Sequence, residues 1–159
     1  MRTLTLMVGL ISTVLFAVTP ATAKTFRWSF ASDIPSMDIH SQNNALANMV
    51  HGSVYESLVI YNSRTFAPEP LLATGWTEVN PRQVRFTLRQ GVRFSDGSAF
   101  GADDVVFSIN RAMAKTSNYH IYTQGIERVV KVNNLTVDIF LSVPNPVLIR
   151  QLTELRMMS

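Results

Sequence analysis

Two segments alternate strictly between apolar and polar side chains, and this pattern limits the fold more than any other feature of the chain. In residues 83–89 valine, phenylalanine and leucine alternate with arginine and threonine, and residues 135–141 repeat the pattern. A period of two predicts β-strands with one buried face and one wet face. Turn-forming residues precede each strand. The sequence therefore predicts two hairpins, of residues 75–79 with 83–89 and of 126–132 with 135–141.

Helical spacing marks three other parts of the chain. Apolar residues at steps of three and four predict helices over residues 44–58, over 102–115 and from 145 to near the chain end. Asn43 or Asn44 is suited to cap the first helix, whose apolar stripe includes Met49 and Val54. Asn145 and Pro146 form a cap and a first-turn proline for the last helix. Short strands complete an α+β fold with about three helices; they are expected at residues 25–31, 59–61 and 92–94.

Residues 1–23 have the three parts of a cleavable secretory signal peptide. Arg2 supplies the positive start, a mainly apolar run extends over residues 4–18, and Ala21-Thr22-Ala23 forms a small-residue cleavage site. A transmembrane anchor is the alternative, but the run is shorter than the roughly 20 residues needed to span a bilayer. We therefore expect export to the periplasm and a mature chain that begins at Lys24.

Composition narrows the class of protein further. The chain has no cysteine, so it forms no disulfide and carries no cysteine for a lipid anchor. The formal net charge of +3 comes from scattered residues and not from a basic block, which argues against nucleic acid as a partner. We expect a free periplasmic protein, stabilised by packing alone.

No motif in the chain supports catalysis, a metal site or a cofactor. His40, His51 and His120 are far apart in sequence, and we expect the first and third in loops and the second on a helix face. Asp103 and Asp104 are adjacent, which suits the start of a helix better than an acid pair. The chain has neither a nucleophile elbow nor a glycine-rich phosphate loop.

Amide and tyrosine side chains gather in two predicted loops. Asn43 and Asn44 precede the first helix, while Tyr119, His120 and Tyr122 lie in the loop of residues 116–125. Such side chains combine hydrogen bonding with flat apolar contact, as sites for backbone-like ligands require. The sequence therefore suggests a binding role here, although surface tyrosines are also common outside binding sites.

The segment VRFTLRQGVRFSDG at residues 84–97 is the most distinctive motif of the chain. It resembles the pattern FxLRxGVxFxDG of the extracytoplasmic solute-binding proteins of family 5, and several other segments resemble that family in order and with matching spacing. Ile39 stands where the family usually has proline, and Gly101 where it often has a threonine cap. The other matching segments are residues 36–40, 54–58, 68–76 and 102–111.

The resemblance implies a fold and a function. It implies the N-terminal part of a two-lobed periplasmic-binding-protein fold that closes on its ligand by a hinge motion. It implies a monomeric, non-enzymatic receptor that needs no cofactor and delivers peptides, or a similar polar solute, to the permease and ATPase of an ABC importer. The ligand-lining residues that it implies, within residues 24–159, are Asn43, Asn44, Ala45, Tyr119 and Tyr122.

Most of the matching motif residues are expected to be structural. Gly91 and Gly97 suit turns in which a Cβ would be costly. Asp96 is expected to accept backbone hydrogen bonds within its own turn. Arg89 and Arg111 are candidates for ion pairs and are not placed in the binding site.

The apolar end of the chain suggests an incomplete clamp. The last helix is expected to run to Ser159 without a stop signal, so that it exposes Leu152 and Leu155. We therefore expect that the second lobe is missing, that stability is marginal and that the chain alone binds no peptide. Two alternatives remain open at this point: a fragment of an exported hydrolase, and a non-functional product of a partial gene.

Overall fold

The computed structural model describes residues 25–159, so the predicted signal peptide at residues 1–23 lies outside the described residues. Residues 33–159 form one compact unit, and residues 25–32 belong to a separate one. In this separate unit, the prediction of a strand over residues 25–31 is wrong. This segment is irregular, and Phe26, Trp28 and Phe30 are exposed. A strand needs a partner for its backbone hydrogen bonds, and none of the paired strands of residues 25–159 includes it.

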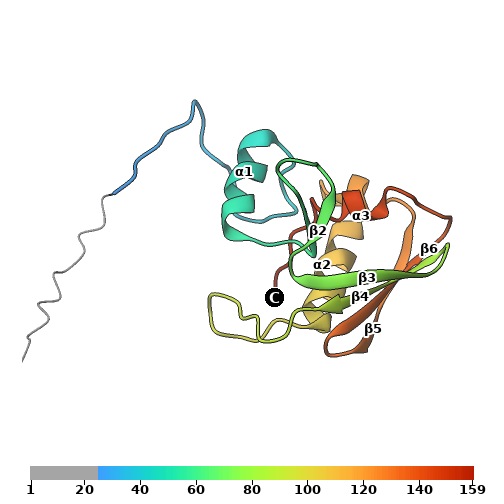
Figure 1. Ribbon diagram of the computed structural model, residues 1–159. Helices are drawn as coiled ribbons and strands as arrows, with labels where there is room; N and C mark the ends of the chain where they lie inside the picture. Colours follow the sequence, from blue (N-terminus) through green and yellow to red (C-terminus); the bar gives the residue numbers. More distant parts are fainter. Residues whose placement is uncertain (1–24) are drawn as a thin grey trace, which may run out of the picture. The chain divides into compact units, whose positions relative to one another are not determined.

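The compact unit is built on a four-stranded antiparallel sheet with strand order β3-β4-β6-β5 (Figure 1). Both predicted hairpins are confirmed: one pairs β3 (Ala73–Asn80) with β4 (Gln83–Leu88), and the other pairs β5 (Ile126–Asn133) with β6 (Thr136–Leu141). The two hairpins join where β4 pairs with β6.

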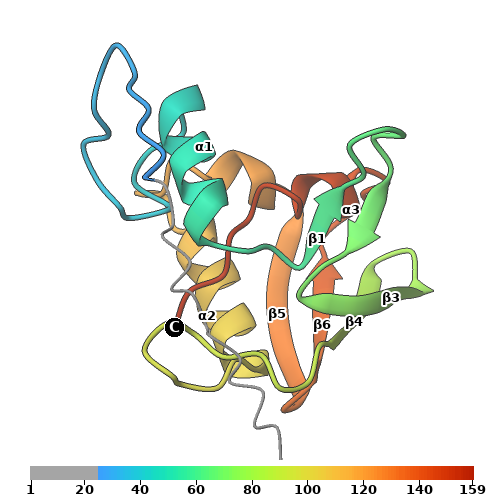
Figure 2. The ribbon, with the colours of Figure 1, turned by 60° about the vertical axis from the view of Figure 1, so that its left-hand side comes forward.

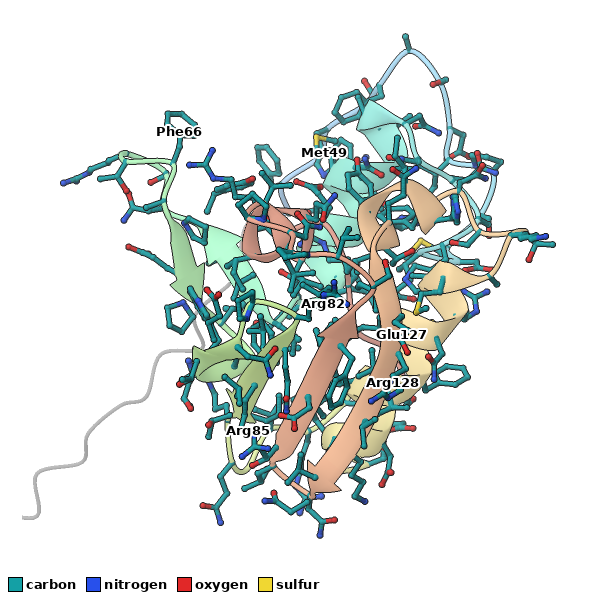
Figure 3. All side chains as sticks on the ribbon, turned by 90° about the vertical axis from the view of Figure 1, so that its right-hand side faces the viewer. Met49, Phe66, Arg82, Arg85, Glu127 and Arg128 are labelled. Atoms are coloured by element: carbon teal, nitrogen blue, oxygen red, sulfur yellow. The ribbon has the colours of Figure 1, made fainter. Side chains whose placement is uncertain are left out.

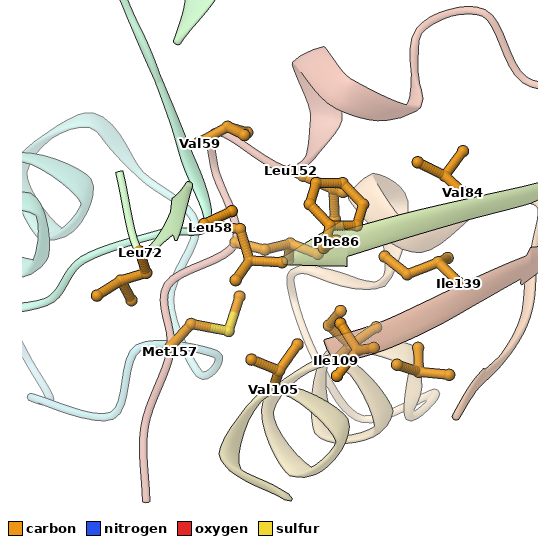
Figure 4. Packing of buried hydrophobic residues seen from close by; sticks show 14 of the residues in the cluster. Leu58, Val59, Leu72, Val84, Phe86, Val105, Ile109, Ile139, Leu152 and Met157 are labelled. Atoms are coloured by element: carbon orange, nitrogen blue, oxygen red, sulfur yellow. The ribbon is translucent and has the colours of Figure 1, made fainter. Parts of the chain in front are cut away.

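One face of the sheet carries the core. Helix α2 (Ala102–Met113) confirms the second predicted helix and lies along the sheet (Figure 2). Its Val105 and Ile109 belong to the same buried cluster as Phe86 of β4 and Ile139 of β6 (Figure 4). The alternation in β4 and β6 therefore marks one buried face, as the sequence predicted, and the structure shows that α2 packs on it.

The other face of the sheet carries charged residues that form cross-strand pairs. The Arg85 Nε of β4 lies 2.7 Å from the Asp138 Oδ1 of β6, its partner in the register. The Arg128 guanidinium of β5 stacks 4.0 Å above the Phe140 ring. Figure 3 labels Arg85 on β4 and Arg128 on β5, the two strands that flank β6. These pairs account for the charged side chains that alternate with the core residues.

Helix α1 (Ala45–Val54) begins where predicted and ends earlier. Its buried residues are Ala47 and His51, whereas Met49 and Val54 are exposed, so the predicted apolar stripe is wrong. The chain leaves the helix at Tyr55, which is extended. Leu58, expected within the helix, therefore enters the core from an extended segment.

A small two-stranded sheet follows α1. It pairs the predicted strand β1 (Val59–Tyr61) with β2 (Pro68–Pro70). The connecting loop holds Phe66 at a φ of 55° with its side chain exposed (Figure 3). This hairpin leads the chain directly into β3.

The loop between β4 and α2 corrects one prediction and confirms another. The strand expected at residues 92–94 is reduced to a single bridge between Arg93 and Ala99. Gly97 has a φ of 89°, and Asp96 accepts a 2.8 Å hydrogen bond from the Ser98 backbone, as predicted for this turn. Tight turns leave too few residues here for a strand.

The C-terminal region differs most from its prediction. Helix α3 has only four residues (Leu148–Gln151) and does not begin at Asn145. Beyond it the chain runs extended between α1 and α2, a segment that we call the tail, residues 155–159 (Figure 2). Its Met157 N–H donates to the Glu56 carbonyl at 2.8 Å.

Packing of the tail buries the residues that were expected to be exposed. Leu152 and Leu155 are 0% and 1% exposed, so the expectation of an exposed apolar helix is wrong. The Ser108 hydroxyl of α2 accepts from the Met158 N–H at 2.9 Å and donates to the Met158 carbonyl at 3.1 Å. The apolar end of the chain is thus part of the core. In the part of the chain that the structure describes, no helix has both the length and the apolarity to cross a membrane.

Candidate functional site

The first turn of α1 and the segment of residues 116–125 meet in space. Three amides and two tyrosines lie at this meeting point, and we call them the amide–tyrosine platform: Asn43, Asn48, Asn118, Tyr119 and Tyr122. Asn48 Nδ2 donates a hydrogen bond to Asn43 Oδ1 at 3.1 Å, and Asn48 Oδ1 accepts one from the Tyr119 hydroxyl at 2.6 Å. Asn43 Nδ2 in turn donates to the Asn118 carbonyl at 3.3 Å.

Tyr119 is the buried member of the platform and belongs to the hydrophobic core. Its side chain is 2% exposed, and burial raises the pKa of its hydroxyl to about 12. It is therefore a neutral donor at physiological pH, held by Asn48. Tyr122 lies in a 3₁₀ turn, η1 (His120–Thr123), with its ring centroid 5.5 Å from that of Tyr119.

The residues predicted for ligand contact divide into two groups. Asn43, Tyr119 and Tyr122 are brought together in the platform. Asn44 Oδ1 instead accepts from the Ala47 N–H at 3.0 Å, which makes its side chain the cap of α1. Ala45 is exposed in the first turn of the helix.

Sequence reasoning missed Asn48 and Asn118. Asn48 lies four residues after Asn44, about one helical turn further along, so the helix prediction contained a signal for its position. Asn118 offers no comparable signal, because its role depends on backbone and side-chain bonds to residues more than seventy positions earlier.

The segment of residues 38–41 supports the platform, and we call it the anchor loop. Asp38 accepts two hydrogen bonds from the Arg111 guanidinium of α2, at 2.7 and 2.6 Å. This pairing lowers the pKa of Asp38 to about 2 and raises that of Arg111. The ion pair expected for Arg111 is confirmed, whereas Arg89 uses its Nε to bond the Leu71 carbonyl at 2.9 Å.

Backbone groups of the anchor loop hold Asn118. The Asn118 N–H donates to the His40 carbonyl at 3.0 Å, and its side-chain amide donates to the Ser41 carbonyl. A cavity of about 230 Å³ lies beside this contact, and residues of the anchor loop, Arg111 and the 114–117 segment line it. The anchor loop, which the Asp38–Arg111 pair fixes to α2, is therefore connected to the platform by the hydrogen bonds of Asn118.

The three histidines occupy different environments. His120 is exposed in η1, and His51 is fully buried on α1 with its Nε2 3.1 Å from the Ser36 carbonyl oxygen. His40 lies in a loop as predicted but is 2% exposed. Over residues 25–159 no three His, Asp or Glu side chains lie close enough together to hold a metal ion.

Comparison with known proteins identifies the family. Residues 67–158 match the model described as bacterial extracellular solute-binding proteins, family 5 Middle. The chain belongs to this family. The match runs from β2 to Met158 in the tail, so it includes Arg111 and the tyrosines of the platform but not α1.

Solved structures of the family share the fold. NikZ from Campylobacter jejuni, in complex with Ni(L-His), aligns with a TM-score of 0.70 and 25% identity over 80% of this chain and 26% of its own. A periplasmic oligopeptide-binding protein from Thermotoga maritima aligns with a TM-score of 0.61 and 30% identity over 67% of this chain and 20% of its own. The chain therefore has the family fold and spans between a fifth and about a quarter of the length of these proteins.

One relative by sequence has a different named role. The HTH-type transcriptional regulator SgrR of Escherichia coli is 32% identical over 92 residues, which are 58% of this chain and 16% of SgrR.

The family and its fold point to a binding protein and not to an enzyme.

Proposed function

We propose that the protein is the substrate-binding component of an ABC importer, which captures a peptide or a similar polar solute in the periplasm and passes it to the permease. Membership of the solute-binding family carries the proposal. The 30% identity to an oligopeptide-binding protein supports a peptide as the solute. The predicted signal peptide supports the periplasm, and we infer a monomer that needs no cofactor.

We propose that the ligand contacts the amide–tyrosine platform and the start of α1. Asn43 is exposed, and its amide already joins the two segments of the platform. Amides fit this role because each offers a donor and an acceptor that match a peptide backbone. Asn43, Asn44 and Ala45 are exposed to solvent, whereas the buried Tyr119 acts through Asn48 and not by direct contact.

A sensing module of a transcriptional regulator is the second candidate, because SgrR contains a similar region. The two candidates differ in location: a regulator works in the cytoplasm with DNA, and an importer receptor works outside the inner membrane. The apolar run and cleavage pattern of residues 1–23 favour the importer.

Uptake by cells that carry the protein tests the proposal. We expect deletion of the gene to reduce uptake of a labelled peptide, with Ni(L-His) as the comparison solute and cell fractionation to locate the protein. Asn43→Ala should reduce uptake as well, whereas Asn110→Ala, on the exposed surface of α2, should leave it unchanged. Unchanged uptake of peptides in the deletion strain, or a protein found only in the cytoplasm, would refute the importer proposal.

A further inference from the structure

His40 is a buried imidazole without a hydrogen-bond partner. Its side chain is 2% exposed, and neither Nδ1 nor Nε2 has a hydrogen-bond partner among the described residues. Buried polar groups are almost always paired, so an unpaired imidazole needs a physical explanation. The neutral ring is tolerated there as a flat apolar body, and its centroid lies 5.5 Å from that of Tyr119.

The surroundings of His40 oppose a positive charge. Burial is the main cause that lowers its pKa to about 4, and the Arg111 guanidinium of α2 adds to the effect. Asp38 of the anchor loop favours the charged form, as does the Arg156 main chain of the tail, which lies near the ring without hydrogen-bond geometry, but both are outweighed. Tyr119 is the titratable group that packs against the ring from the 116–125 segment.

Only His40 among these groups changes its charge between pH 7 and pH 4. Asp38 stays ionised because its pKa is about 2, and Tyr119 stays neutral because its pKa is about 12. Arginines keep their charge over this range. The ion pair between Asp38 and Arg111 therefore persists while His40 titrates.

Two consecutive backbone carbonyls of the anchor loop hold the platform. The carbonyls of His40 and Ser41 accept the two donors of Asn118, and Asn43 bonds to the Asn118 carbonyl. His40 is 2% exposed, with Tyr119, Arg111 and the tail around its ring. Its imidazole therefore reaches water only when the anchor loop moves, and that motion carries the His40 carbonyl with it. Both acceptors of Asn118 then shift together.

We propose that His40 is a pH-dependent latch: protonation draws its ring out of the core, the anchor loop opens, and the amide–tyrosine platform loosens. The opening is a property of the described residues alone. Its consequence, weaker ligand capture in acid, rests on the proposed function. A periplasmic receptor would thus hold its platform most firmly near neutral pH.

The size of the effect follows from linkage. The open loop exposes His40, whose pKa then returns to the ordinary value of 6.5, whereas the closed loop keeps it at about 4. The equilibrium constant for opening should therefore rise on the order of 20-fold between pH 7 and pH 5. Below pH 4 both states bind the proton and the dependence levels off.

Hydrogen exchange resolved by NMR on the purified protein without ligand tests the latch. After correction for intrinsic exchange, the amide of Asn118 should open about 20-fold more at pH 5 than at pH 7, and at both pH values its opening constant should exceed that of the Phe86 amide in β4, which opens only on global unfolding. The ring protons of His40 report its titration directly in the unmodified protein. His40→Leu should abolish the pH dependence at Asn118, and His120→Leu, at an exposed histidine, should keep it.

Three results would overturn the latch. They are a His40 ring that titrates near 6.5, a pH dependence that survives in His40→Leu, and an Asn118 amide whose opening constant equals that of Phe86, which would indicate global unfolding. If His40→Leu does not fold, the ring titration and the exchange of the unmodified protein decide the matter. Because no ligand is present, failure of the importer proposal leaves these readouts unaffected.

Discussion

Replacement of Leu155 by alanine measures whether the tail belongs to the core. Leu155 is 1% exposed and lies in one buried cluster with Leu152 and Met157. Leu155→Ala removes three carbon atoms from a site that cannot collapse freely, because the tail is fixed on both sides by hydrogen bonds. Loss of transfer free energy plus the cavity cost gives about 3 kcal/mol of unfolding free energy.

Urea unfolding followed by fluorescence provides the assay. Trp76 packs against the core, so its emission reports loss of the folded body. At a slope of about 1.5 kcal/mol per molar urea, a loss of about 3 kcal/mol lowers the midpoint by roughly 2 M. The corresponding fall in Tm is roughly 10 °C.

A matched control separates burial from side-chain size. Ile121 carries the same number of carbon atoms on η1 and is 56% exposed, so Ile121→Ala should cost no more than about 0.5 kcal/mol. Equal midpoints for Leu155→Ala and Ile121→Ala would refute the buried tail and restore the expectation of an exposed apolar end.

Three further predictions concern a helix cap, a turn and an ion pair. Asn44→Ala removes the cap of α1 and should lower the unfolding free energy by about 1 kcal/mol in urea titrations; a larger loss would mean that Asn44 does more than cap the helix. Gly97→Ala places a Cβ at a φ of 89° and should cost about 1–2 kcal/mol by the same measurement, and an unchanged midpoint would contradict the turn. Asp38 has its pKa lowered from 3.8 to about 2, so it stabilises the fold above pH 3.8 and loses this contribution as the pH falls toward 2; Arg111→Met should flatten acid unfolding curves in that window, and parallel curves would exclude the pair as their cause.

The parts of the fold that follow from local pattern were predictable. Alternation in β4 and β6 fixes both the strand and its buried face, because side chains on a strand point to opposite sides in turn. The turn at Gly97 likewise depends on neighbouring residues only. These features need no knowledge of the rest of the chain.

The errors arise where burial depends on distant partners. Residues 25–31 alternate like a strand but pair with no strand of the described residues. Leu152 and Leu155 are three residues apart, which looks helical, yet the second lies in an extended tail that contacts α1 and α2. Periodicity reports that a residue is buried and does not report against what.

The candidate site shows the same division. Resemblance to a family led to Asn43, Tyr119 and Tyr122, and the structure brings these residues together, although ligand contact itself stays a prediction. Asn118 was missed because its bonds connect it to residues far earlier in the chain. The burial of His40 was missed because a polar residue in a polar loop is normally exposed.

The position of the tail has a consequence for the timing of folding. Met158 pairs with Ser108, fifty residues earlier, and Arg156 donates to Ser57, ninety-nine residues earlier. These contacts close the body around the tail, and such long-range closures are late and slow steps of folding. During synthesis, a ribosome therefore has to release residue 158 before the core can be completed. Until then the nascent chain remains unfolded, which is the form that the proposed export would require.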